Sequence, residues 1–478
     1  MISKRRVLAL VLAASLVAGL LWAAVLIQGP LAPVEPDRPY CDAYDMYLDI
    51  DPAAGTVFGR MALTVQGREE WQEAPGDLWF HLYPNYFASQ GVLPIAAEDI
   101  AASYPLGFNP GSITIQSLRC NGEEPDYTLT REETLLCLPL KQPLESGEQA
   151  EVFLEFWLEL PHNRYRFGQN EIGLNLTFFH PQLAYYDGAR WHTEPYYSIG
   201  DPFVFATADY EIAIKGAQGY QVAAGGVVEW DGDVCRITAQ NSRDCAIIMS
   251  RGYEVESHTV GKTKVLAYQT KSDGNFALAT ACSALAALEK RFGPYPYPTF
   301  SVVETGLYFY GMEYAGLVQI DTSLYDDERA EELAHTIVHE TAHQWFYAAV
   351  GSDQVNEPWL DEALTEYATV SHLNLWEKQK MLYNHYGAMG IEGHPGGTLR
   401  DYPDSMSYAA QVYLKGSLIL RELAEEIGAE TLDRALKSYV TENYLGMGTP
   451  QALLASIYTH TGKDYSQWLS QKLSPVHN

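Results

Sequence analysis

Two histidines and two glutamates are spaced in this chain as metal ligands and a catalytic base would be. His339, Glu340 and His343 form the pentapeptide H-E-x-x-H inside an apolar-periodic run. Residues four apart on a helix lie on one face, so both imidazoles can reach one zinc ion, with the glutamate between them placed to act on a water molecule. Glu362 follows His343 after eighteen intervening residues as a third candidate ligand. The pattern H-E-x-x-H-x18-E is therefore far more specific than the pentapeptide, which also arises by chance.

This residue set predicts a catalytic metal ion rather than a purely structural one. Three protein ligands leave one tetrahedral position open for water. The metal lowers the pKa of that water and polarises a carbonyl group. Glu340 cannot easily join the same coordination sphere, so we expect it to act first as general base and then as general acid. The alternative is that His339 and His343 are ordinary packed or exposed helix residues, which leaves the matching position of Glu362 unexplained.

Two further residues flank the motif at helical spacing. His335 lies one turn before His339, and Glu366 lies one turn after Glu362. Because three ligands suffice, we expect a structural or supporting role for His335. Glu366 either orients a ligand histidine or is a plain carboxylate on the helix surface.

The elements that must position these side chains can be placed along the second half of the chain. Residues 276–292 are rich in Ala and Leu and stop at a Gly-Pro pair, which predicts a helix. Strands are expected at 299–304 and 316–320. Acidic residues at 326–328 suit the positive end of the helix that carries both histidines. Pro358 suits the first turn of the helix that carries Glu362, and residues 413–473 read as mostly helical.

The first half of the chain predicts β-structure. Segments 61–65, 151–156 and 210–214 alternate or are rich in β-branched and aromatic residues, and glycine-containing turns separate such segments. We therefore expect a multidomain α+β fold, with an antiparallel β-sandwich or saddle-like domain at 41–255 and a mostly helical catalytic domain at 256–478.

The N-terminus predicts a membrane anchor. A Lys-Arg-Arg cluster at 4–6 precedes a nearly unbroken apolar run at 7–27, which is long enough to span a bilayer. The positive cluster places the N-terminus in the cytoplasm and the rest of the chain outside. We expect residues 1–28 to form this anchor, with the lipid bilayer as a partner, and 29–40 to form a Pro-rich linker. A cleaved signal peptide, which would give a secreted protein, is the alternative, although its apolar core is usually shorter.

Composition excludes one class of partner. The formal net charge is −30, which argues against binding nucleic acid. Arg329 is the only Lys or Arg between Glu304 and His372. The resulting negative field favours a divalent cation and the α-ammonium group of a peptide.

Six cysteines allow disulfides but do not require them. Cys235 and Cys245 are close enough in sequence to be bridged, and so, more loosely, are Cys120 and Cys137. Buried free thiols are the alternative. No C-x-x-C motif is present, so cysteine-based zinc sites are not expected.

Two segments, one on each side of the zinc motif, add further similarity to a known family. They are Y-G-M-E-Y at 310–314 and V-Y-L-K-G at 412–416. Together with the zinc motif and W-L-D-E at 359–362, they make the chain resemble the membrane alanyl aminopeptidase family of gluzincin metallopeptidases. The resemblance covers nearly everything after the anchor. It implies a thermolysin-like catalytic domain, one zinc ion per chain and peptide substrates with a free N-terminus.

The resemblance also assigns roles to three further residues. Tyr413 matches the family's catalytic tyrosine, which donates a hydrogen bond to the oxyanion; from the sequence alone Tyr402 and Tyr408 are rivals. Glu313 matches the glutamate of the family's G-x-M-E-N segment, which binds the substrate ammonium. The chain departs from that segment by having its glycine, Gly311, directly before Met312, and the backbone of Gly311 could line the peptide.

The chain departs from the family pattern at several positions. Tyr314 replaces the family asparagine, so local hydrogen bonding must differ, while Asp361 and Ala363 replace an asparagine and a glycine beside the third ligand. A second ammonium-binding carboxylate is expected from the N-terminal domain, around 182–194. The chain ends soon after the catalytic domain, which suggests an open cleft.

These observations predict a membrane-anchored, extracytoplasmic zinc aminopeptidase. One alternative is a zinc endopeptidase or other zinc hydrolase that uses the open cleft. The other is a non-catalytic ectodomain that binds zinc or peptides.

Overall fold

The computed structural model describes residues 41–271 and 273–475. The predicted anchor and linker lie outside these residues. Among the residues that are described, none of the helices combines the length and apolarity needed to cross a bilayer.

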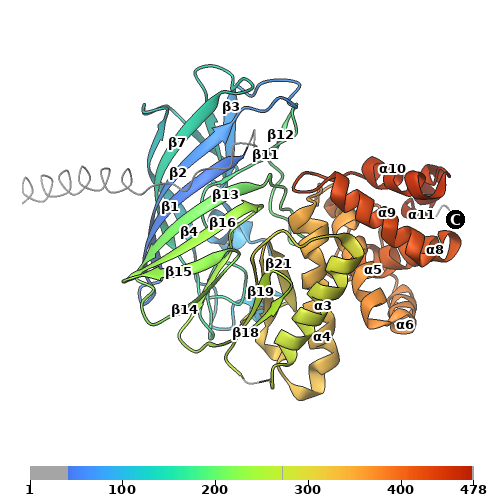
Figure 1. Cartoon of the computed structure of the whole chain (residues 1–478). Helices are drawn as coiled ribbons and strands as arrows, with labels where there is room; N and C mark the ends of the chain where they lie inside the picture. Colours follow the sequence, from blue (N-terminus) through green and yellow to red (C-terminus); the bar gives the residue numbers. More distant parts are fainter. Residues whose placement is uncertain (1–40, 272, 476–478) are drawn as a thin grey trace, which may run out of the picture. The chain divides into compact units, whose positions relative to one another are not determined.

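Strands dominate the first half of the chain (Figure 1). The largest sheet has seven strands in the order β15-β16-β13-β1-β2-β7-β4. Its strands are β1 (Asp42–Asp51), β2 (Thr56–Gln66), β4 (Ser112–Cys120), β7 (Gln149–Glu159), β13 (Ala208–Lys215), β15 (Val227–Asp231) and β16 (Val234–Ser242). Side chains along β1 and β2 alternate between more and less buried positions, because successive residues of a strand point to opposite faces. The sheet is antiparallel as expected except that β1 pairs in parallel with β13, which the long intervening chain permits.

Smaller sheets complete the β-rich half. One has the order β10-β3-β6-β5, and another has the order β14-β17-β9-β8. Their strands are β3 (Asp77–His81), β5 (Thr128–Thr130), β6 (Leu135–Pro139), β8 (Gly168–Gln169), β9 (Leu174–Leu176), β10 (Gln182–Leu183), β14 (Gln221–Ala224) and β17 (Ile247–Ser250). A short hairpin is formed by β11 (Tyr185–Tyr186) and β12 (Trp191–His192).

A five-stranded sheet opens the second half, in the order β18-β19-β20-β22-β21. Its strands are β18 (Glu254–Val260), β19 (Thr263–Gln269), β20 (Thr299–Thr305), β21 (Gly311–Tyr314) and β22 (Leu317–Asp321). Both strands expected here from the sequence are present, as β20 and β22. Helix α3 (Phe276–Phe292) ends at Gly293, whose φ of +111° is a conformation that favours glycine.

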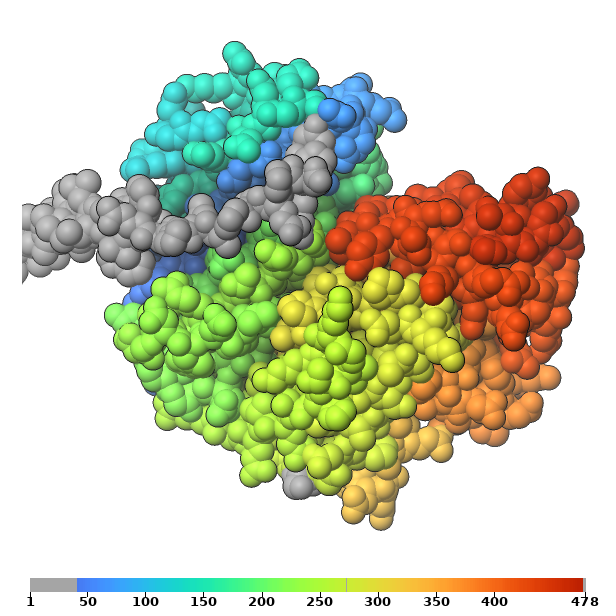
Figure 2. Space-filling model, viewed as in Figure 1, coloured from blue at the N-terminus to red at the C-terminus, as the bar shows by residue number. Residues whose placement is uncertain are grey.

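Helices make up the remainder, shown from yellow to red in Figure 1. The longer ones are α4 (Ala330–His343), α5 (Pro358–Leu373), α6 (Trp376–Gly387), α8 (Gly416–Ile427), α9 (Ala429–Glu442), α10 (Pro450–Thr461) and α11 (Ser466–Leu473). Wider π-type turns continue α4 at Gln344–Ala349 and precede α8 at Ala409–Lys415. The space-filling view shows the helices after residue 400 in red, along one flank of this face (Figure 2). The coarse expectation of a β-rich part followed by a helical part is thus confirmed.

Two hydrophobic clusters underlie this arrangement. The first fills the β-rich half and extends to Met312, Tyr314 and Leu317 of the five-stranded sheet. The second joins the opposite face of that sheet to the helices. Strand β21, at the edge of the sheet, packs against α4 and therefore lies beside the helix that carries the H-E-x-x-H motif.

Candidate metal centre and active site

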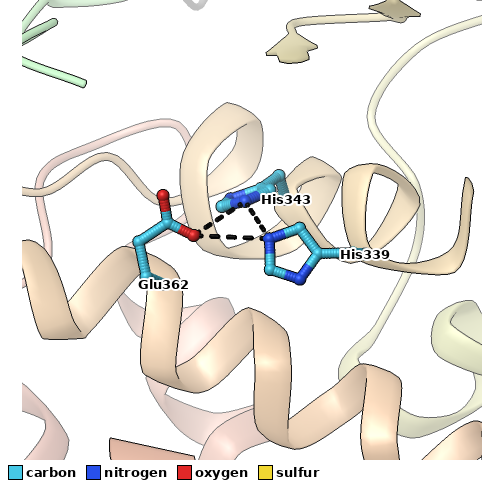
Figure 3. Close-up of side chains that lie close together, drawn as sticks. All are labelled: His339, His343 and Glu362. Carbon is cyan, nitrogen blue, oxygen red and sulfur yellow. Dashed lines mark hydrogen bonds and ion pairs between the residues drawn. The ribbon is translucent and has the colours of Figure 1, made fainter. Parts of the chain in front are cut away.

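Helices α4 and α5 pack together and bring the three predicted ligands to one point (Figure 3). The Nε2 atoms of His339 and His343 lie 3.2 Å apart. Each lies 3.3 Å from Oε2 of Glu362. All three side chains are buried. The three residues are recognisable as a group that could hold a metal ion.

The donor set fits zinc. Metal–nitrogen and metal–oxygen bonds of about 2.0–2.1 Å in a tetrahedron place neighbouring ligand atoms roughly 3.3 Å apart, close to the separations seen here. Oε2 of Glu362 is buried and has no hydrogen-bond partner among the described residues. A buried carboxylate oxygen of this kind needs a cation or a donor, and zinc would supply the cation.

Each ligand histidine is backed by a carboxylate. Nδ1 of His339 lies 2.9 Å from Oε2 of Glu366, and Nδ1 of His343 lies 2.8 Å from Oδ1 of Asp361. An Nδ1–H that donates to a carboxylate leaves the Nε2 lone pair free for a metal. Of the two roles considered for Glu366, its geometry fits orienting His339, and Asp361 takes the corresponding place beside His343.

His335 also contacts this network. Its Nε2 lies 3.3 Å from Oε1 of Glu366, so the two oxygens of Glu366 face two different histidines. The metal cluster itself does not include His335. The position of His335 therefore agrees with the expected structural or supporting role.

Glu340 lies beside the ligand cluster without belonging to it. It is buried, and its Oε2 has no hydrogen-bond partner within the described chain. Burial raises the pKa of Glu340 to about 7, although His339 and His343 act in the opposite direction. By contrast, burial of Glu362 is outweighed by His343 and His339, which lower its pKa to about 2. One carboxylate is thus suited to proton transfer and the other to staying charged.

Tyr413 contacts two of the predicted ligands directly. Its hydroxyl donates to Oε1 of Glu362 at 2.5 Å, and its ring stacks on His339 at 5.6 Å. Of its two rivals, Tyr402 donates to the backbone carbonyl of His394 and so holds a loop. Tyr408 lines the cavity and packs edge-on against Tyr413.

Glu313 lies in the same cavity as the ligands, on β21. Its carboxylate is buried, and Oε1 has no partner among the residues described. Burial raises the pKa of Glu313 well above its ordinary value; Asp201, Asp361 and Glu340 act in the same direction, and His343 opposes them. A cation arriving here would relieve this unfavourable arrangement.

Tyr314 stands at the position where the family pattern has asparagine. Its side chain does not line the cavity but is buried, and its hydroxyl donates to Oε1 of Gln319 at 3.2 Å. Gln344 holds the turn after β21. The amide of Gln344 donates to the carbonyl of Tyr314 and accepts from the N–H of Gly316, both at 2.9 Å.

The cavity that contains these residues has a volume of about 620 Å³. Its wall is rich in aromatic residues from both halves of the chain, namely Tyr165, Tyr197, Tyr308, Phe309, Tyr310, Tyr386, Tyr408 and Tyr413. Gly311 also lines it. Most ligand pockets combine an apolar wall with a few polar groups in this way.

Sequence reasoning missed Asp201 and Arg166. Both line the cavity, and the guanidinium of Arg166 lies 2.6 Å from Oδ1 of Asp201. The aromatic rings of Tyr165, Tyr196, Phe203 and Phe309 surround that guanidinium. The expectation that a second carboxylate comes from 182–194 is wrong, because none of those residues lines the cavity. In the sequence, the signal that could have identified Asp201 was its position directly before the apolar run 202–206.

The cysteines are free thiols. Cys235 and Cys245 are buried in the β-rich core instead of being bridged, and Cys120 and Cys137 are not bridged either. Neither of the two cysteine pairs considered for a disulfide is therefore bridged.

A β-rich half is followed by a helical half that has H-E-x-x-H on one helix and a glutamate on the next, and this arrangement is the one expected of gluzincin-type zinc metallopeptidases. Residues 276–471 match the family model described as the peptidase family M1 domain. The helical half of the chain thus matches a peptidase family M1 domain, and the resemblance seen in the sequence is confirmed.

Curated relatives match about half of the chain. Aminopeptidase M1 from Arabidopsis thaliana is 26% identical over 258 residues, which is 48% of this chain and 29% of that protein. Aminopeptidase M1-A from Oryza sativa subsp. japonica is 27% identical over 49% of this chain and 30% of that protein. Endoplasmic reticulum aminopeptidase 1 from Rattus norvegicus is 28% identical over 41% of this chain and 23% of that protein. The matched regions thus span less than a third of these relatives.

Solved structures share the fold along nearly the whole chain. A mutant M1 zinc metallopeptidase from Deinococcus radiodurans superposes with a TM-score of 0.61 at 19% identity, covering 92% of this chain and 95% of that one. A structure of it bound to a Tyr-Ser-Ala substrate gives a TM-score of 0.61 at 18% identity, covering 91% and 94%. A two-domain M1 zinc metallopeptidase mutant bound to L-tryptophan gives a TM-score of 0.62 at 19% identity. That match covers 92% of this chain and 95% of that one.

Proposed function

We propose that this chain is a zinc aminopeptidase that removes N-terminal residues from peptides. The observation that carries the proposal is the buried, unpartnered carboxylate of Glu313 in the same cavity as the ligand cluster. A free peptide N-terminus is a cation that can enter from solvent and pair with Glu313. Asp201, held by Arg166 on the cavity wall, would supply the second negative group for the ammonium. The relatives named aminopeptidases and the neighbour bound to a tripeptide support this substrate class.

Each residue of the site has its own role in the proposed hydrolysis. His339, His343 and Glu362 would hold the zinc ion, which when bound supplies Lewis-acid polarisation and a water of lowered pKa. Glu340 would take a proton from the attacking water as its oxygen bonds to the scissile carbonyl carbon. Glu340 would then deliver that proton to the amine as the carbon–nitrogen bond breaks. Tyr413 would donate a hydrogen bond to the carbonyl oxygen as negative charge develops on it, a contribution of about 2.7–4 kcal/mol for one such donor.

The experiment compares substrates that differ only at the amino group. The purified full chain should hydrolyse an aminoacyl arylamide and a tripeptide, and N-acetylation of either should abolish cleavage. Undiminished cleavage of acetylated peptides would instead identify an endopeptidase. Bound zinc without hydrolysis of any member of a broad peptide library would identify a non-catalytic binding protein.

We also propose that residues 1–28 anchor the protein in a membrane with the catalytic domain outside the cytoplasm. The support is the basic cluster followed by the apolar run in the sequence. Fractionation of expressing cells tests this proposal. The chain should sediment with membranes, resist extraction by high salt and be released by detergent, whereas recovery in the soluble fraction would overturn the anchor.

A further inference from the structure

Strand β21 gives the substrate cavity a direction. Its Glu313 is the proposed ammonium-binding group, and after burial His343 has the largest effect on the pKa of that carboxylate. Two residues earlier, Gly311 lies beside the proposed base Glu340, since a Cβ built on it would be 2.5 Å from Oε1 of that residue. A peptide whose N-terminus meets Glu313 therefore has its scissile bond near Gly311, and its later residues extend towards the chain that precedes β21.

The residues before β21 form the wall on this leaving-group side. Tyr308, Phe309 and Tyr310 all line the cavity. Tyr310 continues the strand pairing, because the N–H of Asp321 donates to its carbonyl at 2.8 Å. The ring of Tyr308 stacks on that of Tyr165 at 5.7 Å. Aromatic faces accept both apolar side chains and cations, so these rings alone do not decide the charge of the substrate side chain.

Asp99 adds a carboxylate to the same wall. It lines the cavity from the β-rich half and is partly exposed. Burial raises the pKa of Tyr308, with Tyr165 and Asp99 acting in the same direction and Arg166 opposing them, so the charge of Asp99 lies near the Tyr308 hydroxyl. Asp99 directly precedes the short helix α2 (Ile100–Ser103), but its side chain does not cap that helix. The carboxylate is therefore available to a ligand.

Among the described residues that line the cavity, Asp99 is the acidic one with neither a partner nor a task in the proposed function. Burial raises the pKa of Asp99, and the charged neighbour Glu98 raises it further, so no cation compensates the carboxylate. The other acidic residues of the wall pair with Arg166 or with histidines, or have roles in binding the ammonium, holding zinc or transferring protons; they are Asp201, Glu313, Glu340, Glu362 and Glu366.

We propose that Asp99 makes the enzyme select peptides with a cationic side chain, arginine or lysine, on the leaving-group side of the scissile bond. The aliphatic stem of such a side chain would pack on the rings of Tyr308 and Tyr310, while its charged head pairs with the Asp99 carboxylate. The proposal rests on the proposed function and adds a substrate class to it.

The first test uses peptides that differ by one charge. In Ala-X-Ala-Ala and Ala-Ala-X-Ala, X is either arginine or citrulline, which has a similar shape but no charge. At one or both positions, kcat/KM for release of the first alanine should be roughly 5-fold higher with arginine, the upper end for a partly exposed ion pair. About 0.5 M sodium chloride should weaken this preference by screening. Equal rates for arginine and citrulline at both positions would overturn the proposal, as would a preference confined to X as the first residue.

Variants assign the preference to one carboxylate. Asp99→Asn should lower the arginine-to-citrulline ratio by roughly 5-fold, the loss of the same ion pair. Asp99→Lys should make the enzyme favour glutamate over glutamine at that position. Glu98→Gln is the matched control, because it removes the same charge from an adjacent, exposed residue that does not line the cavity. A ratio that Asp99→Asn leaves unchanged, or that Glu98→Gln lowers equally, would show that Asp99 is not the selecting group.

A binding measurement separates this inference from the proposed function. In a Glu340→Gln background, calorimetry should give a lower Kd for the arginine peptide than for the citrulline peptide, and adding Asp99→Asn should bring the two values together. Identical Kd values in the Glu340→Gln background would overturn the role of Asp99. Failure of the wild-type chain to release any amino acid would instead count against the aminopeptidase activity alone.

Discussion

Gly416 packs directly against Ala363, where α5 and α8 approach each other closely. A Cβ on Gly416 would lie 2.6 Å from the Cβ of Ala363. Ala363 directly follows the ligand Glu362, and Tyr413 lies three residues before Gly416. This close approach is what lets the hydroxyl of Tyr413 reach within 2.5 Å of Glu362.

Gly416→Ala should therefore move Tyr413 away from the ligand cluster. We expect kcat to fall by about 10- to 100-fold, because a displaced oxyanion donor loses much of the roughly 10²–10³-fold effect of such a group. Adding Ala363→Gly removes the clashing methyl group and should restore most of the lost rate. Steady-state kinetics of the two single variants and the double variant test this. A double variant as slow as Gly416→Ala alone would contradict the packing explanation.

Glu340→Gln should remove turnover while leaving the metal in place. Glutamine has nearly the same shape but cannot accept the water proton, and loss of a general base costs about 10²–10⁴-fold in rate. Zinc should remain at one ion per chain, because Glu340 is not among the residues grouped around the metal position. Kinetics and metal analysis of the same sample are the measurement. Full activity in this variant would refute the assigned role.

Glu313→Gln should weaken recognition of the substrate amino group. A charge-assisted hydrogen bond contributes about 1.5–3 kcal/mol, which corresponds to a fall of roughly 10- to 100-fold in kcat/KM. Glu171→Gln is a matched control, since Glu171 is an exposed glutamate that does not line this cavity. If the two variants were equally active on an aminoacyl arylamide, Glu313 would not be the ammonium-binding group.

Glu366→Gln should weaken zinc binding by about 10- to 100-fold, the usual effect of removing a carboxylate that orients a ligand histidine. His335→Gln should have a smaller effect, because His335 contacts only the other oxygen of Glu366. Competition with a chelator gives the zinc affinity directly. The opposite order of effects would mean that His335, and not Glu366, controls the site.

Asp244 should make stability fall as pH rises. It is buried, and it accepts hydrogen bonds from the Tyr347 hydroxyl at 2.6 Å and from the N–H of Ala315 at 3.3 Å. Burial raises the pKa of Asp244 to about 7, against about 3.9 in an unfolded chain. A raised folded-state pKa contributes stability that is fully present below about pH 4 and is lost as pH rises through about 7.

Denaturant unfolding of the wild-type chain and of Asp244→Asn at about pH 5 and about pH 8 measures this contribution. The wild type should lose more stability between the two pH values than the variant does, because asparagine cannot ionise. An identical pH dependence in both proteins would show that Asp244 does not titrate in this range.

The sequence by itself determined the ligand set, because its signal is local. His339 and His343 are four residues apart on one helix, and the position of Glu362 follows from a short connection to the next helix. The same locality explains the agreement for α3 and α5, since Gly293 follows the end of α3 and Pro358 starts α5. Alternation along the strands likewise indicated the β-rich half, and the acidic, lysine-poor surroundings of the motif indicated a site for cations.

Only the tertiary structure decided which distant residues complete the site. Arg166 and Asp201 come from the β-rich half, and no local pattern links them to a helix more than a hundred residues away. The nearness of Gly311 to Glu340 likewise depends on how β21 packs against α4. Periodicity and spacing report the conformation of one segment, whereas a cavity wall is set by how separate segments pack, and that information is not contained in any single stretch of the chain.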